Sequence, residues 1–409
     1  IRHDLPELRH VIIAGEEAPD GTIPLDEMSQ RPWEEQYPAE DLHQISFGPF
    51  EVSEVLPTSG STGLLKLCER TEAVYCLHGR SVSAQLKLTA EDVIGIFSPL
   101  SGGPGLSAWC SAPQVAAPSV LLDRLEPKEM LATIQREKIT VLSTMPTALV
   151  RMLNYEGLGD YDLSSLRAVR CGAAALRPAV AREAEARLGC LIVPAAGARE
   201  VGIAFTSVDD SPEIRLQTVG RPLPGNEIRL VDEDGREAPP GETGELWARG
   251  AFSSSGYYKD MPATLEAWGQ LGSEGWYRTG DLARYDQVGT LMLVGRKKEM
   301  ILRGGQNIYP REIEQHLLSH PHVADVCIVP FPDPVMGERA CACIVLKLGF
   351  RLTFEEMVAF LNDKKLAPYK LPERLEIREQ FPLLADGLKV DKRALAQDIT
   401  LRLEIEGPG

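Results

Sequence analysis

Nine consecutive residues of this chain read Thr58-Ser59-Gly60-Ser61-Thr62-Gly63-Leu64-Leu65-Lys66. Glycine and small hydroxyl residues let a backbone turn tightly and aim several N–H groups at one point, which creates a site for an anion. Lys66 adds a positive charge to that site. The spacing between the glycines and the lysine differs from the GxxxxGK[ST] pattern of P-loop proteins. Such a stretch is also typical of a simple turn, so its interpretation depends on its surroundings.

Apolar strand-like runs alternate with amphipathic helical runs beyond this stretch, as far as about residue 191. We expect strands at 93–97, 139–143, 166–171 and 190–194, and helices at 127–138, 147–153 and 177–188. This alternation predicts mostly parallel sheets covered by helices.

The pattern of apolar runs and turns in the sequence changes twice further along the chain. From residue 213 to residue 250, turns that contain Pro-Gly and Asp-Gly separate short β-like runs, which predicts a β-rich subdomain. After Gly295-Arg296-Lys297-Lys298 a compact α+β pattern begins. There we expect a helix from Pro310 to about residue 318, strands at 323–330 and 340–346, and a capping box of Thr353 and Glu356 that opens a helix.

Charge and composition exclude several classes of partner. With 43 basic and 59 acidic residues the net charge is −16, which repels nucleic acid and anionic lipid. An anionic substrate such as ATP would therefore need a local cradle. No apolar run reaches the roughly 18 residues that span a bilayer. The 8 cysteines form no CxxC pair, so we expect no zinc ribbon, reduced thiols and a cytoplasmic protein.

With Leu56-Pro57 before it and Arg70-Thr71 after it, the stretch at 58–66 resembles the phosphate-binding signature of the adenylate-forming superfamily. That superfamily comprises acyl- and aryl-CoA ligases, the adenylation domains of peptide synthetases, and luciferases. Further segments resemble the same superfamily in its order: Gly172-Ala173-Ala174-Ala175-Leu176, Gly244-Glu245-Leu246, Gly256-Tyr257-Tyr258, Tyr277-Arg278-Thr279-Gly280-Asp281, Gly304-Gly305-Gln306-Asn307-Ile308-Tyr309-Pro310 and Gly387-Leu388-Lys389. The first signature looks closest to the aryl-acid branch.

The resemblance runs from about residue 50 onward and implies an α/β fold. We expect a large adenylation core of stacked, mostly parallel sheets with a β-rich subdomain over residues 1–297. A small, mobile α+β lid would follow over residues 298–409. Complete members of the superfamily carry a further N-terminal portion, so we expect the core of this chain to be truncated at its N-terminus.

The resemblance also implies an activity and its site. A carboxylic acid and ATP would form an acyl-AMP with Mg²⁺, and coenzyme A would then accept the acyl group. Lys389 and Glu200 would be catalytic, Glu200 and Thr62 would hold the metal, and Asp281 would accept both ribose hydroxyls. The implied binding residues for ATP and coenzyme A are Thr58, Ser59, Gly60, Ser61, Thr62, Gly63, Lys66, Gly172, Ala173, Gly197, Arg199, Asp281, Arg296, Lys298, Gly304 and Gly305.

Two departures from the family pattern leave alternatives open. Ala196 replaces the aromatic residue that stacks on adenine in the family. A non-catalytic protein of the same family that only binds nucleotide is therefore an alternative function. Residues 99–105 lack the family's aromatic–His or His-Asn pair, so we discount dihydroxybenzoate as the acid. An aryl, alicyclic or fatty acid, a carrier protein in place of coenzyme A, and a homodimer all stay open.

Overall fold

The computed structural model describes residues 10–14, 19–32, 35, 40, 46–58, 66–122, 124–173, 176–269, 275–383 and 390–406. Within these ranges no helix is long and apolar enough to cross a bilayer. The chain divides into two compact units, Ile1–Glu51 and Val52–Gly409. In the first unit β1 (Ile12–Ile13) pairs in parallel with β2 (Ile23–Pro24), and α1 (Leu25–Ser29) follows.

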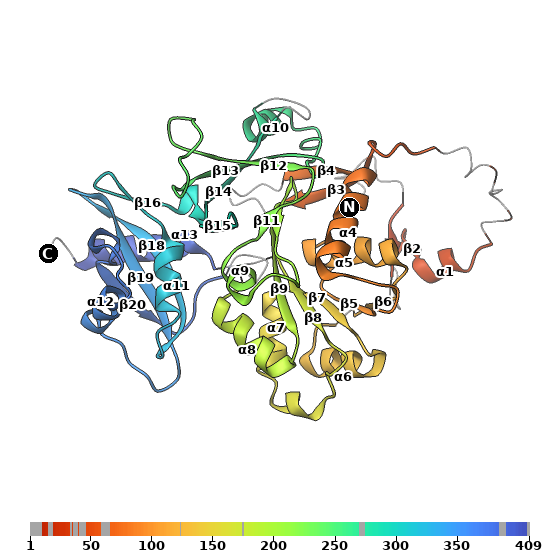
Figure 1. Cartoon of the computed structure of the whole chain (residues 1–409), viewed down its shortest axis with the longest axis horizontal. Helices are drawn as coiled ribbons and strands as arrows, with labels where there is room; N and C mark the ends of the chain where they lie inside the picture. Colours follow the sequence, from red (N-terminus) through yellow and green to blue (C-terminus); the bar gives the residue numbers. More distant parts are fainter. Residues whose placement is uncertain are drawn as a thin grey trace. The chain divides into compact units, whose positions relative to one another are not determined.

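A seven-stranded sheet forms the centre of the second unit (Figure 1). Its order is β11 (Arg221–Pro222), β10 (Gly202–Phe205), β9 (Leu191–Gly197), β8 (Ala168–Cys171), β7 (Val141–Thr144), β5 (Ile94–Phe97) and β6 (Ser119–Leu121). The five strands β5 to β9 are parallel, while β10 and β11 run antiparallel to their neighbours. The four strands that we predicted all form, and each starts one or two residues later than predicted.

Helices cover both faces of this sheet, because alternate residues of its buried strands point to opposite sides. On β8, Val169 packs with α6 (Pro127–Glu137), α7 (Pro146–Leu153) and α8 (Pro178–Leu188), which match the predicted helices to within one residue. Ala168 packs on the other face with α4 (Glu72–Leu86) and α5 (Gly103–Ser111). Of two short 3₁₀ turns, η1 (Ala112–Val115) packs on this second face through Ala112, and η2 (Glu156–Asp160) packs on the first face through Leu158.

An antiparallel sheet lies beyond this α/β/α sandwich in the sequence. Its order is β12 (Asn226–Val231), β13 (Gly244–Gly250), β14 (Tyr277–Tyr285) and β15 (Leu291–Arg296). α10 (Met261–Trp268) packs against β14. The predicted β-rich subdomain is wrong at its start, because residues Pro212–Gln217 form a helix, α9. The side chain of its N-cap, Ser211, accepts a hydrogen bond from Ile214 N–H. Proline at the first helical position and serine at the N-cap both favour a helix there.

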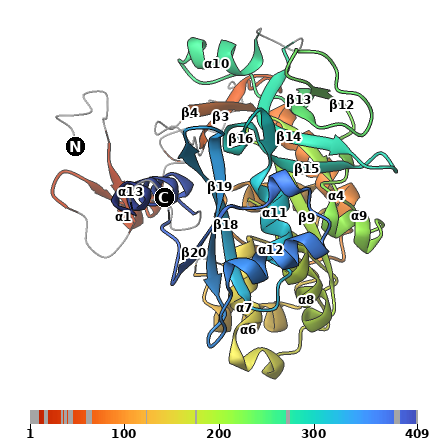
Figure 2. The ribbon, with the colours of Figure 1, turned by 90° about the vertical axis from the view of Figure 1, so that its left-hand side faces the viewer.

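A second mixed sheet begins after η3 (Lys297–Glu299). It contains β16 (Ile301–Arg303), β17 (Gln306–Ile308), β18 (Val323–Asp333), β19 (Gly337–Leu346) and β20 (Arg374–Arg378). In Figure 2, α11 (Pro310–Leu317) and α12 (Phe354–Asp363) lie on one face and α13 (Lys392–Glu406) on the other, which agrees with two separate buried clusters. The predicted capping box of Thr353 and Glu356 is confirmed, with both of its hydrogen bonds present. One further 3₁₀ turn is η4 (Pro368–Lys370).

Candidate active site

The predicted phosphate-binding stretch begins and ends in a β-hairpin. β3 (Val52–Thr58) and β4 (Lys66–Thr71) pair antiparallel, and Thr58 is directly opposite Lys66. The predicted binding residues Ser59, Gly60, Ser61, Thr62 and Gly63 lie outside the described residues. Thr58 is buried and Lys66 is partly exposed, so these two residues mark the base from which the predicted loop extends.

Lys66 and the predicted metal ligand Glu200 both contact the same tyrosine, Tyr257. The Lys66 Nζ atom is 5.0 Å from the centre of the Tyr257 ring. The Tyr257 hydroxyl donates a hydrogen bond of 2.9 Å to Glu200 Oε1. The Lys66 Nζ atom also lies 3.9 Å from Glu266 Oε2, and the Glu266 side chain is largely exposed. The structure therefore brings together two predicted residues that are 134 positions apart in the sequence.

Backbone contacts hold Glu200 in the connection between β9 and β10. The Ser254 N–H donates to the Glu200 carbonyl at 2.7 Å, and the Cys68 thiol donates to the Arg199 carbonyl at 3.5 Å. Gly197, the last residue of β9, pairs with Gly202 at the start of β10. The loop that carries Gly197, Arg199 and Glu200 is thus fixed to β4 and to the segment after β13. The side chain of Ala196 is outside the described part of the structure.

Tyr257, which contacts the Glu200 carboxylate, belongs to a cluster of three aromatic rings. The Trp268 ring centre is 5.3 Å from that of Tyr257 and 4.8 Å from that of Tyr277. Burial, together with the negative charge of Glu200, raises the pKa of Tyr257 and of Tyr277 far above the usual value for a phenol. Both phenols therefore stay protonated, and Tyr257 remains a hydrogen-bond donor at any physiological pH.

The chemistry of Glu200 fits a ligand for a divalent cation. Its side chain is buried, with 7% relative exposure, yet in the described ranges no lysine or arginine forms an ion pair with it. The charge of the buried Arg70 acts on Glu200 without a direct ion pair, and a bound cation would stabilise the buried carboxylate further. Mg²⁺ in nucleotide sites is commonly held by one or two carboxylates and by substrate phosphates. Within the described residues, no group of three or more His, Cys, Asp or Glu side chains could hold a metal.

The predicted ribose residues pair with each other across two strands. Asp281 on β14 is opposite Arg296 on β15, and Arg296 Nε lies 2.8 Å from Asp281 Oδ1. The Asp281 N–H donates to Thr279 Oγ1 at 3.0 Å, which fixes the backbone at the carboxylate. Burial raises the pKa of Asp281, although the positive charge of Arg296 opposes this shift. A nucleotide that used both carboxylate oxygens would have to share one of them with Arg296.

Gly172 and Ala173 follow β8 at the carboxyl edge of the parallel sheet, where ligands of α/β proteins commonly bind. A Cβ atom on Gly172 would lie 3.4 Å from Ala195 Cβ and 3.5 Å from Pro104 Cγ, so β9 and α5 meet beside it. Ala173 has a φ of 71°, a conformation that costs energy for a residue with a side chain. Strain of this kind is common at ligand sites.

The remaining predicted residues belong to the C-terminal part of the chain. Lys298 lies in η3, and Gly304 and Gly305 form the turn between β16 and β17 with φ values of 55° and 81°. The Gly304 N–H donates to the Met336 carbonyl at 2.8 Å. No contact within the described residues joins this turn to Glu200 or Asp281. Lys389 lies outside the described residues.

Sequence reasoning missed two residues that connect these parts. Tyr257 was only part of a quoted family segment, and its contact with Glu200 depends on a long-range fold. Lys392, at the start of α13, lies 2.8 Å from Glu299 Oε2 in η3 and 3.1 Å from Glu314 Oε1 in α11. Neither contact has a signal in the local sequence.

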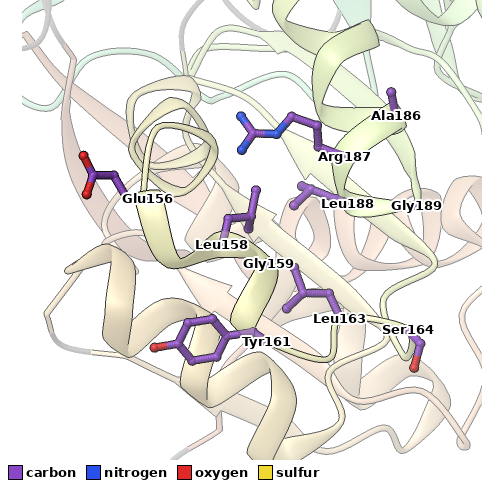
Figure 3. Close-up of a pocket in the computed structure, with 10 residues that line it drawn as sticks. All are labelled: Glu156, Leu158, Gly159, Tyr161, Leu163, Ser164, Ala186, Arg187, Leu188 and Gly189. Atoms are coloured by element: carbon purple, nitrogen blue, oxygen red, sulfur yellow. The ribbon is translucent and has the colours of Figure 1, made fainter.

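A surface hollow of about 460 Å³ lies between η2 and the end of α8 (Figure 3). It is lined by apolar residues, among them Leu158, Leu163 and Leu188, and by polar groups such as Glu156 and Arg187. None of the described site residues lines it. The candidate site is therefore defined by side-chain contacts around Glu200 and Asp281 and not by this hollow.

Comparisons with known proteins identify the family of this chain. The sequence profile described as "AMP-binding enzyme" matches residues 2–258, so the match extends further toward the N-terminus than we predicted. The profile described as "AMP-binding enzyme C-terminal domain" matches residues 312–387. This chain belongs to the adenylate-forming, AMP-binding enzyme family.

Relatives of this chain include CoA ligases and AMP ligases. It is 37% identical over 356 residues to the medium-chain fatty-acid–CoA ligase of Escherichia coli, covering 86% of this chain and 62% of that protein. It is 33% identical over 420 residues to the 2,3-dihydroxybenzoate-AMP ligase of Bacillus subtilis, covering 98% of this chain and 72% of that protein. The chain thus spans less than two thirds of the first of these relatives.

Solved structures show the same fold. The anthranilate CoA ligase AuaEII in complex with anthranoyl-AMP superimposes with a TM-score of 0.82 at 25% identity, over 98% of this chain and 75% of that one. ATP-bound MatB from Rhodopseudomonas palustris superimposes with a TM-score of 0.76 at 27% identity, over 87% and 69% respectively.

Proposed function

We propose that this chain carries out the ATP-dependent activation of a carboxylic acid as acyl-AMP and transfers the acyl group to coenzyme A. The observation that carries the proposal is that the buried Glu200 carboxylate and Lys66, at the base of the predicted phosphate loop, contact the same tyrosine, Tyr257. Membership of the AMP-binding family supports the first step, and the names of the E. coli and AuaEII relatives support the second.

In the first step a carboxylate oxygen of the acid attacks the α-phosphorus of ATP. The new O–P bond forms as the bond to pyrophosphate breaks, so both reacting groups are anions. At 4 Å two like charges repel by about 4 kcal/mol at an effective dielectric of 20, against about 1 kcal/mol in water. We assign Lys389 to a position between the acid carboxylate and the α-phosphate. Its ammonium group would offset the repulsion between them and stabilise the charge of the transition state.

Other residues would bind and orient the nucleotide. Residues 58–66 would surround the phosphates with N–H groups and with the Lys66 ammonium group, and Asp281 and Arg296 would bind the ribose. Glu200, with Thr62, would hold Mg²⁺, which when bound neutralises part of the phosphate charge. Gly172, Ala173, Gly197 and Arg199 would line the adenine and acyl side of the site.

In the second step a thiol attacks the acyl carbon and AMP leaves. The residues that serve each step differ, which gives a physical reason for a moving domain. We propose a lid over residues 298–409 that pivots about Lys298. This motion would withdraw Lys389 and bring the Gly304–Gly305 turn to the thiol channel. The boundary at residue 297 and the motion are predictions.

The acid and the acceptor are the finer parts of the proposal. Aryl, alicyclic and fatty acids are all candidates, and the segment from Gly305 to Pro310 favours coenzyme A. A carrier protein is the second candidate acceptor, because the signature at residues 58–71 resembles that of aryl-acid enzymes. The experiment is pyrophosphate release with MgATP over a panel of these acids, each with and without coenzyme A. Turnover with one acid class, accelerated by coenzyme A, is the expected result.

Two further measurements separate the alternatives. Lys389→Ala should abolish acyl-AMP formation and largely spare thioester formation from supplied acyl-AMP; equal loss of both steps would contradict the pivoting lid. A non-catalytic relative would bind ATP in isothermal titration and release no pyrophosphate with any acid.

A further inference from the structure

One tyrosine contacts both charged residues at the base of the phosphate loop. The Tyr257 hydroxyl donates to Glu200 Oε1 at 2.9 Å, and the Tyr257 ring centre lies 5.0 Å from Lys66 Nζ. At 6% relative exposure Tyr257 is as buried as Glu200. The hydrogen bond between them is therefore desolvated, which makes it stronger than one at the surface.

The position of Tyr257 is fixed from several sides. Its N–H donates to Thr264 Oγ1 at 2.9 Å, and its backbone forms a β-bridge with Cys68 on β4. Its ring packs edge-on against Trp268, with ring centres 5.3 Å apart. A donor that cannot move restricts the rotamers of the carboxylate that it binds. One oxygen of Glu200 is thereby held, and the carboxylate has a defined orientation.

We propose that Tyr257 is a positioning residue for metal-bound nucleotide: its hydroxyl orients the Glu200 carboxylate, and its ring supports the Lys66 ammonium group. This inference rests on the proposed function, because it assigns Glu200 to the metal and Lys66 to the phosphates. The inference adds a link between Glu200 and Lys66, because the Tyr257 side chain sets the distance between the metal ligand and the phosphate-binding lysine. A group that fixes a ligand in this way commonly changes metal affinity about 10- to 100-fold when it is removed.

The next residue in the chain provides a matched control. Tyr258 has the same side chain, but it is 42% exposed and its ring lies 5.1 Å from the Lys259 Nζ atom. Its N–H pairs with the Leu67 carbonyl at 2.7 Å, a contact that substitution of the side chain leaves in place. Tyr257→Phe and Tyr258→Phe each remove one hydroxyl and keep the ring, but only Tyr257→Phe removes a hydrogen bond to Glu200.

The test measures nucleotide affinity by isothermal titration, with ATP plus Mg²⁺ and with ATP plus EDTA. In Tyr257→Phe we expect the Kd for MgATP to rise about tenfold and the Kd for metal-free ATP to stay within about twofold of wild type. Tyr258→Phe should leave both constants unchanged. An unchanged MgATP affinity in Tyr257→Phe, or an equal loss with and without Mg²⁺, would overturn the inference.

Two controls keep the test decisive. If Tyr257→Phe does not fold, Trp268→Leu removes the ring that packs against Tyr257 and leaves both Glu200 and the Tyr257 hydroxyl in the chain, so it should give a smaller loss that also depends on Mg²⁺. A metal-independent loss in Trp268→Leu would equally overturn the inference. If the wild type shows no difference between MgATP and ATP and forms no acyl-AMP, the proposed function fails and not only the role of Tyr257.

Discussion

Replacement of Asp281 by asparagine should separate nucleotide binding from stability. The change keeps the shape of the side chain and removes its charge. In the folded protein, Asp281 is paired with Arg296 at 2.8 Å, but the Arg296 side chain is 50% exposed. Pairs of this kind contribute about 0–1 kcal/mol. We therefore expect Asp281→Asn to lower the free energy of unfolding by less than about 1 kcal/mol.

The raised pKa of Asp281 acts in the opposite direction to the loss of this pair and makes the expected change in stability smaller still. Burial raises its pKa in the folded state, with Arg296 opposing the shift. A carboxyl group whose pKa is raised on folding contributes stability at low pH, and this contribution is lost as the pH rises through the raised value. At neutral pH the ionised carboxylate therefore opposes folding slightly, and asparagine removes that opposition.

The loss in nucleotide binding should be much larger. Hydrogen bonds to a charged group contribute about 1.5–3 kcal/mol, which corresponds to a rise of about 10- to 150-fold in the Kd for ATP. Isothermal titration gives the affinity and urea unfolding gives the stability. The matched control is Glu227→Gln, which breaks a cross-strand pair with Arg249 in the same sheet, at 3.0 Å. Unchanged ATP affinity in Asp281→Asn, or an equal loss in Glu227→Gln, would refute the assignment of Asp281 to the ribose.

Three other substitutions test the fold. Burial alone would raise the pKa of Asp92, but hydrogen bonds from Arg167 and Thr140 lower it to about 2. Asp92→Asn should therefore cost about 2–3 kcal/mol in urea unfolding at pH 7, and the gap to wild type should narrow as the pH falls from about 4 to 2. Gly220→Ala should prevent folding or lower the melting temperature sharply, because its Cβ would lie 1.9 Å from the Phe205 carbonyl oxygen at a φ of 84°. Lys392→Met removes the cation that pairs with Glu299 and Glu314. The loss should make local opening of η3 and α13 more frequent, so limited proteolysis should cleave there faster than in wild type.

The strands and helices of the large sheet could be predicted from local patterns. Fully apolar runs such as Ile94–Phe97 are buried on both faces, and helices that start at Pro127, Pro146 and Pro178 begin where a proline favours the first turn. The helix α9 was missed because a six-residue helix carries too little periodicity to outweigh the turn-rich residues around it.

The contacts within the predicted site could not be read from the sequence. Family order assigned Glu200, Lys66, Asp281 and Arg296 to one site, and that assignment stays a prediction. The sequence contained no sign that Asp281 and Arg296 pair, because that depends on the register of β14 against β15. The contact of Tyr257 with Glu200 likewise arises from β4, the β9–β10 connection and the segment after β13, which are far apart in sequence.

The most direct test of the account follows one oxygen atom. If the acid carboxylate attacks the α-phosphate and a thiol then displaces AMP, one carboxylate oxygen must leave with AMP. An acid labelled with ¹⁸O in its carboxylate, turned over with MgATP and coenzyme A, should give AMP with one labelled oxygen and unlabelled pyrophosphate by mass spectrometry. AMP without label, or label in phosphate or pyrophosphate, would contradict acyl-AMP formation at this site.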